Sequence, residues 1–302
     1  MDFEIFSPGT IGNFGSGFDI LGACLEGIGD RFTFQQADAY RISIKGLDAS
    51  LIPTDIASNT VTIAARKLYE LTGHDKPFEV TIHRELPSSG GLGSSAASSV
   101  AGAMAAAKFC GLERDFPLII EAALTAEASV SGRHLDNILP CLFGGICLQK
   151  APDSLEYYQI PLGMDLQTIL ILPNTKIKTA DSRLALPPHL LQSEWIKEMA
   201  SCSLLISGIL QGDRKQISSA LDSPYSERYR HHLLPGFSQL KSQLLDRDDV
   251  YGFSLSGAGP TCFALVNEDC DFQAIKDKAY QAFGQNTKFI RSKVSQQGAR
   301  FL

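Results

Sequence analysis

The sequence has 302 residues, of which 44% are hydrophobic and 20% charged, and its formal net charge is -6. This composition is typical of a globular protein and excludes an intrinsically disordered chain. The negative charge and the lack of a long basic run argue against nucleic-acid or anionic-membrane partners. No stretch is apolar for long enough to predict a membrane helix, and the opening residues, MDFEIFSPG, do not resemble a signal peptide.

The seven cysteines are odd in number and contain no C-x-x-C pair. This pattern indicates reduced thiols rather than a disulfide framework or a zinc site. We therefore expect a cytoplasmic protein. Cys141 and Cys147 have no base nearby in the sequence and are expected to be buried packing residues.

The first half of the chain mixes predicted strands and helices. Alternating hydrophobic and polar residues predict strands over 32–36, 40–46 and 78–86. Helices are expected over 60–73, with Ser58 or Asn59 as the cap and Gly73 at the end, and over 94–109 and 117–130. A strand over 144–150 is followed by the polar stretch APDSLEYY, where we expect a domain boundary between residues 152 and 153.

The second half begins with a predicted strand over 166–173 and continues with helices around 193–211 and 235–245. Two strand-like runs surround a glycine turn over 252–266, and a helix near 272–283 precedes a strand near 287–294. Strands and helices that do not alternate strictly favour an α+β fold over a doubly wound sheet.

Residues 87–99, PSSGGLGSSAASS, lie between a predicted strand and a helix made almost entirely of Ala, Ser, Gly and Met. The unpaired N–H groups at a helix start attract phosphate, and glycines before it let the ligand approach the backbone. Ser94 and Ser95 add hydroxyl groups that can contact phosphate or magnesium. The loop therefore predicts a polyphosphate site, with tight packing of small residues as the alternative.

Two other interpretations of this loop fit less well. A Walker motif requires a lysine directly after the last glycine, and none is present. GLGSSA satisfies the dinucleotide pattern G-x-G-x-x-A, but Pro87, Ser88 and Ser89 separate it from the strand. The acidic residues about 20 positions further on, Glu113 and Asp115, lie in a turn between helices rather than after a second strand.

Further segments accompany the loop in a fixed order. SPGTIGNFGSGFDILG lies near the N-terminus, HLDNILP at 134–140, KIKTADSRLALP and RHHLLPGF in the second half, and SGAGPT at 256–261. Together with PSSGGLGSSAA they resemble the motifs of the GHMP kinases, in particular those members that phosphorylate L-homoserine. The resemblance extends from Phe6 to about Phe263.

The resemblance implies a two-domain α+β GHMP kinase fold. Its N-terminal, ATP-binding part would be a ribosomal-protein-S5-like domain over 1–152. Its C-terminal part would be a ferredoxin-like α/β plait over 153–302. Nucleotide and substrate would meet in the cleft between the two parts.

The loop matches the family's ATP motif, P-x-x-x-G-L-G-S-S-A-A, and the resemblance assigns it to the phosphates. Asn59 is assigned to the adenine, and Ser95 with Glu127 to magnesium, although Glu127 lies one residue closer to His134 than the family pattern expects. The loop residues assigned to ATP are Pro87, Gly90, Gly91, Leu92, Gly93, Ser94, Ser95 and Ala96.

The resemblance implies L-homoserine as the substrate, and the charged side chains agree with it. Asp19 can pair with its ammonium group, and Arg183 and Arg230 can hold its carboxylate through bidentate hydrogen bonds. Asn137 offers both a donor and an acceptor to its hydroxyl. The same subsite is assigned Asn13, His134 and Asp136.

The implied reaction moves the γ-phosphoryl group of ATP to this hydroxyl, and it depends on positioning and charge neutralisation. Thr179 and Arg183 are expected to aid the transition state, and Asn137 to hold the hydroxyl. We expect no dedicated base, so that the proton passes to the γ-phosphate itself. Asp136 is the alternative, as a base.

Two other functions remain open. A sister GHMP kinase for mevalonate would not need an ammonium partner, and one for galactose would need more hydroxyl partners. A nucleotide-binding regulator without activity would not need Asp19, Glu127 and the paired arginines. The expected ligands are a small-molecule substrate, ATP and magnesium, and the resemblance is compatible with a homodimer.

Overall fold

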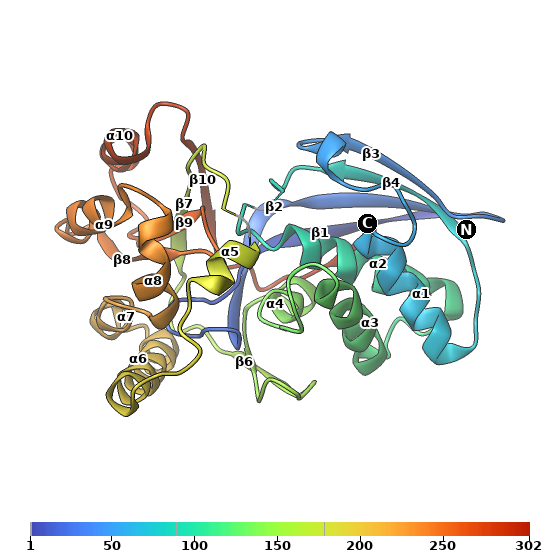
Figure 1. Cartoon of the computed structure of the whole chain (residues 1–302), viewed down its shortest axis with the longest axis horizontal. Helices are drawn as coiled ribbons and strands as arrows, with labels where there is room; N and C mark the ends of the chain where they lie inside the picture. The colour runs from blue at the N-terminus through green and yellow to red at the C-terminus, as the bar shows by residue number, and fades with distance from the viewer. Residues whose placement is uncertain (1, 89, 178) are drawn as a thin grey trace.

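The computed structural model describes residues 2–88, 90–177 and 179–302, and it contains two β-sheets that lie next to each other along the long axis of the molecule (Figure 1). The strands of the first sheet are Asp2–Ile11 (β1), Leu21–Gln36 (β2), Arg41–Gly46 (β3), Phe78–Arg84 (β4), Ile146–Gln149 (β5), Tyr157–Ile160 (β6) and Arg300–Phe301 (β11). Their order is β11-β1-β2-β4-β3, and β5 pairs with β2 and β6. The pair β3 and β4 is parallel, with a helical crossover between them.

Four helices cover one face of the first sheet (Figure 1). They are Thr60–Thr72 (α1), Ser94–Cys110 (α2), Phe116–Ala128 (α3) and Ile138–Phe143 (α4), and a short 3-10 helix, Ala49–Leu51, precedes α1. The small residues of α2 let it approach α1 closely, because a Cβ added at Gly102 would lie 2.1 Å from the carbonyl oxygen of Val61. Tight packing thus explains the body of α2, and the loop before it remains free for another role.

The second sheet consists of Gln167–Leu172 (β7), Val250–Leu255 (β8), Cys262–Val266 (β9) and Lys288–Lys293 (β10), in the order β10-β7-β9-β8. Each neighbouring pair is antiparallel. Helices lie between β7 and β8 and between β9 and β10, so the elements follow one another as β-α-β-β-α-β. This succession, with the strand order above, is that of a ferredoxin-like plait. The helices of this half are Thr179–Leu184 (α5), Gln192–Gln211 (α6), Arg214–Ala220 (α7), Tyr225–Arg230 (α8), Phe237–Leu245 (α9) and Phe272–Phe283 (α10), with a 3-10 helix at His231–Leu233.

The predicted helices and strands of both halves are present, and the α+β fold is confirmed. Asn59 is the cap of α1 and accepts a hydrogen bond from the N–H of Val61, and Gly73 ends this helix in the left-handed conformation. The sequence did not predict β1, whose Pro8 and Gly9 argue against a strand. They are tolerated because the register with β2 shifts between Pro8 and Thr10, as in a β-bulge.

Of the two buried hydrophobic clusters, the larger spans both halves and the smaller lies within the second half. The larger buried cluster contains residues of the first sheet together with Leu205, Leu221 and Phe263 of the second half. At its centre Phe14 stacks on Phe263 with the ring centroids 5.2 Å apart. The strands β6 and β11 lie beyond residue 152 and still pair within the first sheet, so the boundary at 152/153 stays a prediction.

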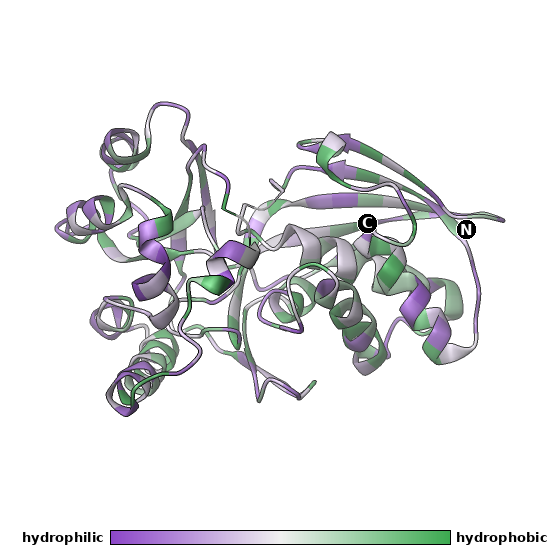
Figure 2. Ribbon diagram, in the orientation of Figure 1, coloured by the Kyte–Doolittle hydropathy of each residue, from purple (hydrophilic) through white to green (hydrophobic). Residues whose placement is uncertain are grey.

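Hydrophobic and hydrophilic segments alternate along most helices and strands (Figure 2). Among the described residues no helix is both long enough and apolar enough to cross a membrane. All seven cysteines are free thiols, and Cys141 and Cys147 are fully buried, as expected for packing residues.

Candidate active site

A cleft of about 380 Å³ opens where the two sheets meet, and its walls come from both halves of the chain. Leu92 and Ala96 of the predicted ATP loop have fully buried side chains, and Pro87 does not line the cleft. Thr179 begins α5, and its side chain lies outside the described residues. The other predicted site residues all line the cleft: Asn13, Asp19, Asn59, Gly90, Gly91, Gly93, Ser94, Ser95, Glu127, His134, Asp136, Asn137, Arg183 and Arg230.

The glycine loop holds the start of α2 open toward the cleft. Gly93 is the capping residue and adopts a left-handed conformation, and among the described residues no side chain caps the first N–H groups of the helix. Neither Gly91 nor Gly93 could carry a side chain, because a Cβ there would lie 2.4 Å from the carbonyl oxygen of Ser256 and 1.9 Å from Oγ1 of Thr10. The free N–H groups and the helix dipole make this an anion site.

Glu127 lies beside this helix start with one carboxylate oxygen unused. Its Oε1 accepts a hydrogen bond of 2.9 Å from Ser95 Oγ and another from the Ser131 hydroxyl. Oε2 is buried and has no partner among the described residues. Burial raises the pKa of Glu127, and the two serine hydroxyls oppose this shift. An unsatisfied buried carboxylate oxygen next to a hydroxyl is a donor set that suits a hard cation such as magnesium.

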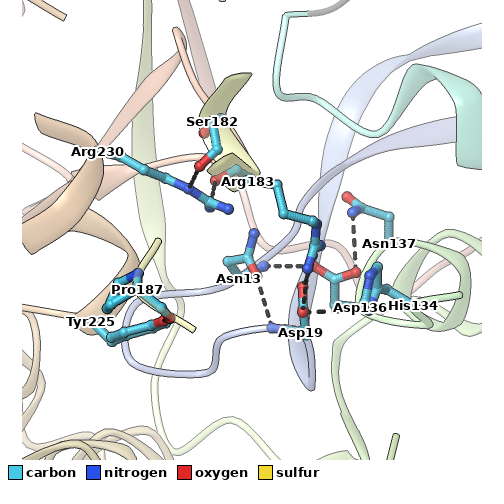
Figure 3. Close-up of polar contacts among 11 residues, drawn as sticks. Asn13, Asp19, His134, Asp136, Asn137, Ser182, Arg183, Pro187, Tyr225 and Arg230 are labelled. Atoms are coloured by element: carbon cyan, nitrogen blue, oxygen red, sulfur yellow. Dashed lines mark hydrogen bonds and ion pairs between the residues drawn. The ribbon is translucent and has the colours of Figure 1, made fainter. Parts of the chain in front are cut away.

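A chain of hydrogen bonds fixes the N-terminal glycine segment. Oδ2 of Asp136 accepts from the N–H of Asn13, and Oδ1 of Asn13 accepts from the N–H of Asp19, both at 2.8 Å (Figure 3). Asn13 and Asp19 both have positive φ angles, of 51° and 58°. Such left-handed residues are uncommon outside glycine, so the buried carboxylate of Asp136 is what stabilises this turn and presents Asp19 to the cleft.

Asp19 is paired with Arg183 rather than free. Nη1 and Nη2 of Arg183 each donate a hydrogen bond of 3.1 Å to the two carboxylate oxygens (Figure 3). Nδ1 of His134 lies 3.5 Å from Oδ2 of the same carboxylate. Burial lowers the pKa of His134, Asp19 opposes this, and Arg183 adds to it. The imidazole is therefore neutral at neutral pH and serves as a hydrogen-bonding group rather than a charge.

Arg230 is buried and connects two segments of the second half. Its Nε donates to the carbonyl oxygen of Ser182 at 2.9 Å, and its Nη1 donates to that of Gly257 at 3.3 Å (Figure 3). Both Arg230 and Arg183 lie over the ring of Phe18, with distances of 5.3 and 5.8 Å to the centroid. Burial lowers the pKa of Arg230 to about 10, so it remains charged, and within the described residues its Nη2 donates no hydrogen bond and can serve a ligand.

Asn137 stands between the phosphate loop and this charged cluster. Its Oδ1 accepts a hydrogen bond of 2.8 Å from Oγ1 of Thr10. A Cβ on Gly12 would lie 2.3 Å from its Nδ2, and one on Gly93 would lie 2.9 Å from its Oδ1. The glycines of two different motifs therefore make room for this one amide, which can contact a group lying between the two subsites.

Known proteins resemble this chain over its whole length. The GHMP kinases N terminal domain matches residues 59–145, and the GHMP kinases C terminal domain matches residues 205–286. A homoserine kinase of Pyrococcus abyssi is 32% identical over 100% of both chains, and one of Thermococcus kodakarensis is 34% identical over 91% of both. The crystal structure of homoserine kinase from Cytophaga hutchinsonii superimposes with a TM-score of 0.91 and 31% identity, covering 100% of this chain and 97% of its own. The chain belongs to the homoserine kinases of the GHMP kinase family.

The family membership confirms the two-domain GHMP fold expected from the motifs. As a GHMP kinase the protein uses ATP as its phosphoryl donor and a small molecule as the acceptor. The first family match includes the glycine loop, Glu127 and the HLDN segment. The second includes Arg230 and the turn at 256–261, whose Ser256 hydroxyl donates to the carbonyl oxygen of Gly91.

Several residues that line or support the cleft of this kinase were not found from the sequence, among them Lys176, Arg84, Ser131 and Phe18. Lys176 and Arg84 line it, Ser131 contacts Glu127, and Phe18 lies below both arginines. A lysine or an arginine in a loop or at a strand end carries no pattern of its own. Phe18 does lie inside the quoted N-terminal motif, and its place before Asp19 is the signal that could have found it.

Proposed function

We propose that this site transfers the γ-phosphoryl group of ATP to the side-chain hydroxyl of L-homoserine, which yields ADP and O-phospho-L-homoserine. The observation that carries this proposal is the pairing of Asp19 with Arg183 next to the buried Arg230. One carboxylate and two guanidinium groups at one end of a cleft complement the ammonium and carboxylate of an amino acid. The full-length similarity to homoserine kinases supports the same substrate.

The substrate would separate the ion pair of Asp19 and Arg183 and bind to both residues. Its ammonium group takes the place of the Arg183 guanidinium on Asp19, and its carboxylate binds the released Arg183 and the free Nη2 of Arg230. The neutral His134 and the Asn13 amide border the same position. The hydroxyl then lies toward Asn137, which stands next to the phosphate loop.

The nucleotide would bind with its phosphates on the N–H groups at the start of α2. The cleft also has an apolar wall of Leu51, Ile52 and Pro53, which suits the adenine ring. Asn59 lies there with only 2% of its surface exposed, and its Nδ2 donates to the carbonyl oxygen of Pro53 at 2.7 Å. Asn59 therefore shapes the adenine wall as well as capping α1.

Magnesium would be held by Ser95 and Glu127, whose unsatisfied Oε2 fits this cation. A bound magnesium ion supplies charge neutralisation for the transferring phosphoryl group. The Ser95 hydroxyl donates its proton to Glu127, so its lone pairs are available to a metal. Thr179 and Arg183 complete the proposed machinery from α5.

The proposed reaction needs no dedicated base. Asp136 lies next to Asn137, whose Nδ2 donates to its Oδ1 at 3.4 Å, and its Oδ2 already accepts the N–H of Asn13. Removing that carboxylate from its hydrogen bond would release the left-handed turn that carries Asp19. The hydroxyl proton is therefore expected to pass to the γ-phosphate. A cytoplasmic location, expected from the free thiols, is part of the same proposal.

The test is ADP release with MgATP and a panel of L-homoserine, D-homoserine, L-threonine, mevalonate and galactose. Selective turnover of L-homoserine is the expected result. Turnover of mevalonate or galactose instead would keep the ATP site and discard the roles of Asp19, Arg183 and Arg230. Binding of ATP without turnover of any alcohol would favour a regulator.

A further inference from the structure

Arg84 is a buried cation directly behind the phosphate loop. It ends β4, and only 4% of its surface is exposed. Its Nη2 donates hydrogen bonds to the carbonyl oxygen of Leu86 at 2.8 Å, to Ser88 Oγ at 3.3 Å and to Ser94 Oγ at 2.7 Å. One guanidinium group thus touches the start of the loop and the first residue of α2.

Asp30 of β2 holds Arg84 in this position. Its Oδ2 lies 3.4 Å from Nη1 of Arg84, and its Oδ1 accepts the N–H groups of Glu85 and Leu86, both at 2.8 Å. The side chain of Asp30 is fully buried. A buried ion pair is costly to desolvate, and the hydrogen bonds that Asp30 accepts and Arg84 donates offset this cost. The pair fixes the path by which the chain leaves β4 and enters the loop.

The two serine hydroxyls at the start of α2 have opposite hydrogen-bonding roles. Ser94 Oγ accepts a hydrogen bond from a cation, so its own proton must be donated elsewhere. No hydrogen bond donated by this hydroxyl occurs within the described part of the chain, and Ser94 lines the cleft. Ser95 Oγ does the reverse, because it donates to Glu127 and keeps its lone pairs free. Ser94 can therefore donate to an anion, and Ser95 can offer its lone pairs to a cation.

The guanidinium group of Arg84 also has a hydrogen-bond donor that is not used. Nε of Arg84 is buried and has no hydrogen-bond partner among the described residues. Asp30 pairs with Nη1, but Nη2 contacts Ser94 at the positive end of α2, where a second anion would stabilise both the guanidinium group and the helix start. We propose that Arg84 is a positioning residue for the phosphates of the nucleotide, which orients the Ser94 hydroxyl as a phosphate donor and supplies the positive charge that a lysine provides in Walker loops.

This inference rests on the proposed ATP site and is tested by equilibrium binding rather than turnover. The probes are MgATP, MgADP and adenosine, titrated against the full chain by calorimetry. Arg84→Met alone would leave Asp30 as an unpaired buried charge and endanger folding. The main variant is therefore Asp30→Asn/Arg84→Met, in which the amide oxygen can still accept the N–H groups of Glu85 and Leu86.

We expect this double variant to bind MgATP about 10- to 100-fold more weakly, and adenosine within about twofold of the wild type. Ser94→Ala should weaken MgATP binding by about 5-fold, the cost of one neutral donor. The triple variant Asp30→Asn/Arg84→Met/Ser94→Ala combines these changes. Because Arg84 acts partly through Ser94, its fold-loss of MgATP affinity should be smaller than the product of the fold-losses in the double variant and in Ser94→Ala.

Arg41→Met is the matched control, because it removes an exposed arginine from β3, next to β4. It should leave the affinity for all three probes unchanged. An equal loss for adenosine and MgATP in the main variant would overturn the proposal, since it would indicate a collapsed loop. Unchanged MgATP affinity in a folded main variant would overturn it as well. A wild type that binds MgATP but does not phosphorylate L-homoserine would refute the proposed function and leave this test intact.

Discussion

The Asp19 carboxylate accepts two hydrogen bonds from Arg183, and the two charges neutralise each other across the mouth of the cleft. A ligand with both an ammonium and a carboxylate can separate them and provide each with a new partner. A ligand with only one of these charges leaves one member of the pair without a counterion. Selectivity for an amino acid thus follows from the pair itself.

We therefore predict that 4-hydroxybutanoate, which lacks the ammonium, and 3-aminopropan-1-ol, which lacks the carboxylate, are poor substrates. Their kcat/KM should fall by about 10- to 100-fold relative to L-homoserine, a moderate loss because the side chain of Arg183 is 41% exposed and screened by solvent. Steady-state assays with saturating MgATP measure this. Equal kcat/KM for either analogue would contradict the exchange of partners.

Asp136 gives a prediction on pH. Burial, together with the negative charges of Asp19 and Glu127, raises the pKa of Asp136 to about 7, while the N–H of Asn13 and the charge of Arg183 oppose this rise. Between about pH 4 and 7 the folded protein holds a proton that the unfolded chain has released, so the free energy of unfolding falls as the pH rises through this window. Asp136→Asn should remove this dependence and raise the unfolding free energy by about 2–4 kcal/mol at pH 8.

Thermal unfolding of the wild type and of Asp136→Asn at pH 5 and pH 8 measures this difference in unfolding free energy, which should be large at pH 8 and small at pH 5.

Steady-state kinetics of the same variant test whether Asp136 acts as a base. Without a dedicated base, Asp136→Asn should reduce kcat by about tenfold or less, whereas Arg183→Ala should reduce it by about 100-fold. Similar losses in the two variants would establish Asp136 as a base.

At the scale of an element, α8 carries Arg230 and is anchored from behind by a buried cluster. Glu227 of α8 accepts hydrogen bonds from Lys241 of α9 and, at 2.8 Å, from the Ser254 hydroxyl of β8. The side chains of Glu227 and Lys241 are only 8% and 10% exposed. The position of Arg230 above the cleft depends on this anchor, because its helix has just six residues.

We predict that Lys241→Met lowers the unfolding free energy by about 3–5 kcal/mol, since it leaves Glu227 unpaired, and raises KM for homoserine about tenfold. The affinity for MgATP should not change, because the glycine loop lies on the other half. Glu227→Gln/Lys241→Met should recover most of the stability. Arg247→Met, which breaks the more exposed pair with Asp249, is the control and should cost about 1 kcal/mol or less. A rise in the Kd for MgATP would contradict this assignment.

At the scale of the whole molecule, the cleft exists because one buried cluster spans both sheets and the last strand of the chain joins the first sheet. Phe14 and Phe263 stack across the junction, and β11 returns from the C-terminus to pair with β1. The N–H of Gly257 donates to the carbonyl oxygen of Gly12 at 2.9 Å, which joins the two glycine motifs directly. The halves are therefore expected to unfold as one unit.

We predict that the full chain shows a single thermal transition and that fragments 1–152 and 153–302 do not fold separately. The first would lack β6, β11 and the covering side chains of Leu205, Leu221 and Phe263. The loss of about 3–5 kcal/mol typical of each removed core phenylalanine already approaches the stability of a domain. Circular dichroism of the separate fragments measures this. A cooperative transition in fragment 1–152 would show instead that the proposed boundary separates independent domains.

Most of the fold could be predicted from local patterns. The helices α1 and α10 have side-chain caps and hydrophobic periodicity, α2 is a long run of alanine and other small residues, and β4 alternates strictly. The strand β1 was missed because Pro8 and Gly9 contradict strand propensity, and a bulge compensates for them only once β2 is beside it. The strand β6 was missed because its four residues lie in a polar stretch and pair only with β5.

The candidate site also has a part that could be predicted from local patterns and a part that could not. Motif order alone identified Asp19, Glu127, Asn137, Arg183 and Arg230 as members of one cleft, because glycine, charge and spacing at these positions are local properties of the chain. The sequence thus determined the family, the reaction class and many of the residues that line the cleft.

Which of these residues touch each other was decided by the tertiary structure. The pairing of Asp19 with Arg183 spans 164 positions, and the support of Asn13 by Asp136 spans 123. Arg84 carries no motif, and only the packing of β2 against β4 places it between Asp30 and Ser94. The physical reason is that charge pairing and burial depend on distances between segments far apart in the chain, which no local pattern contains.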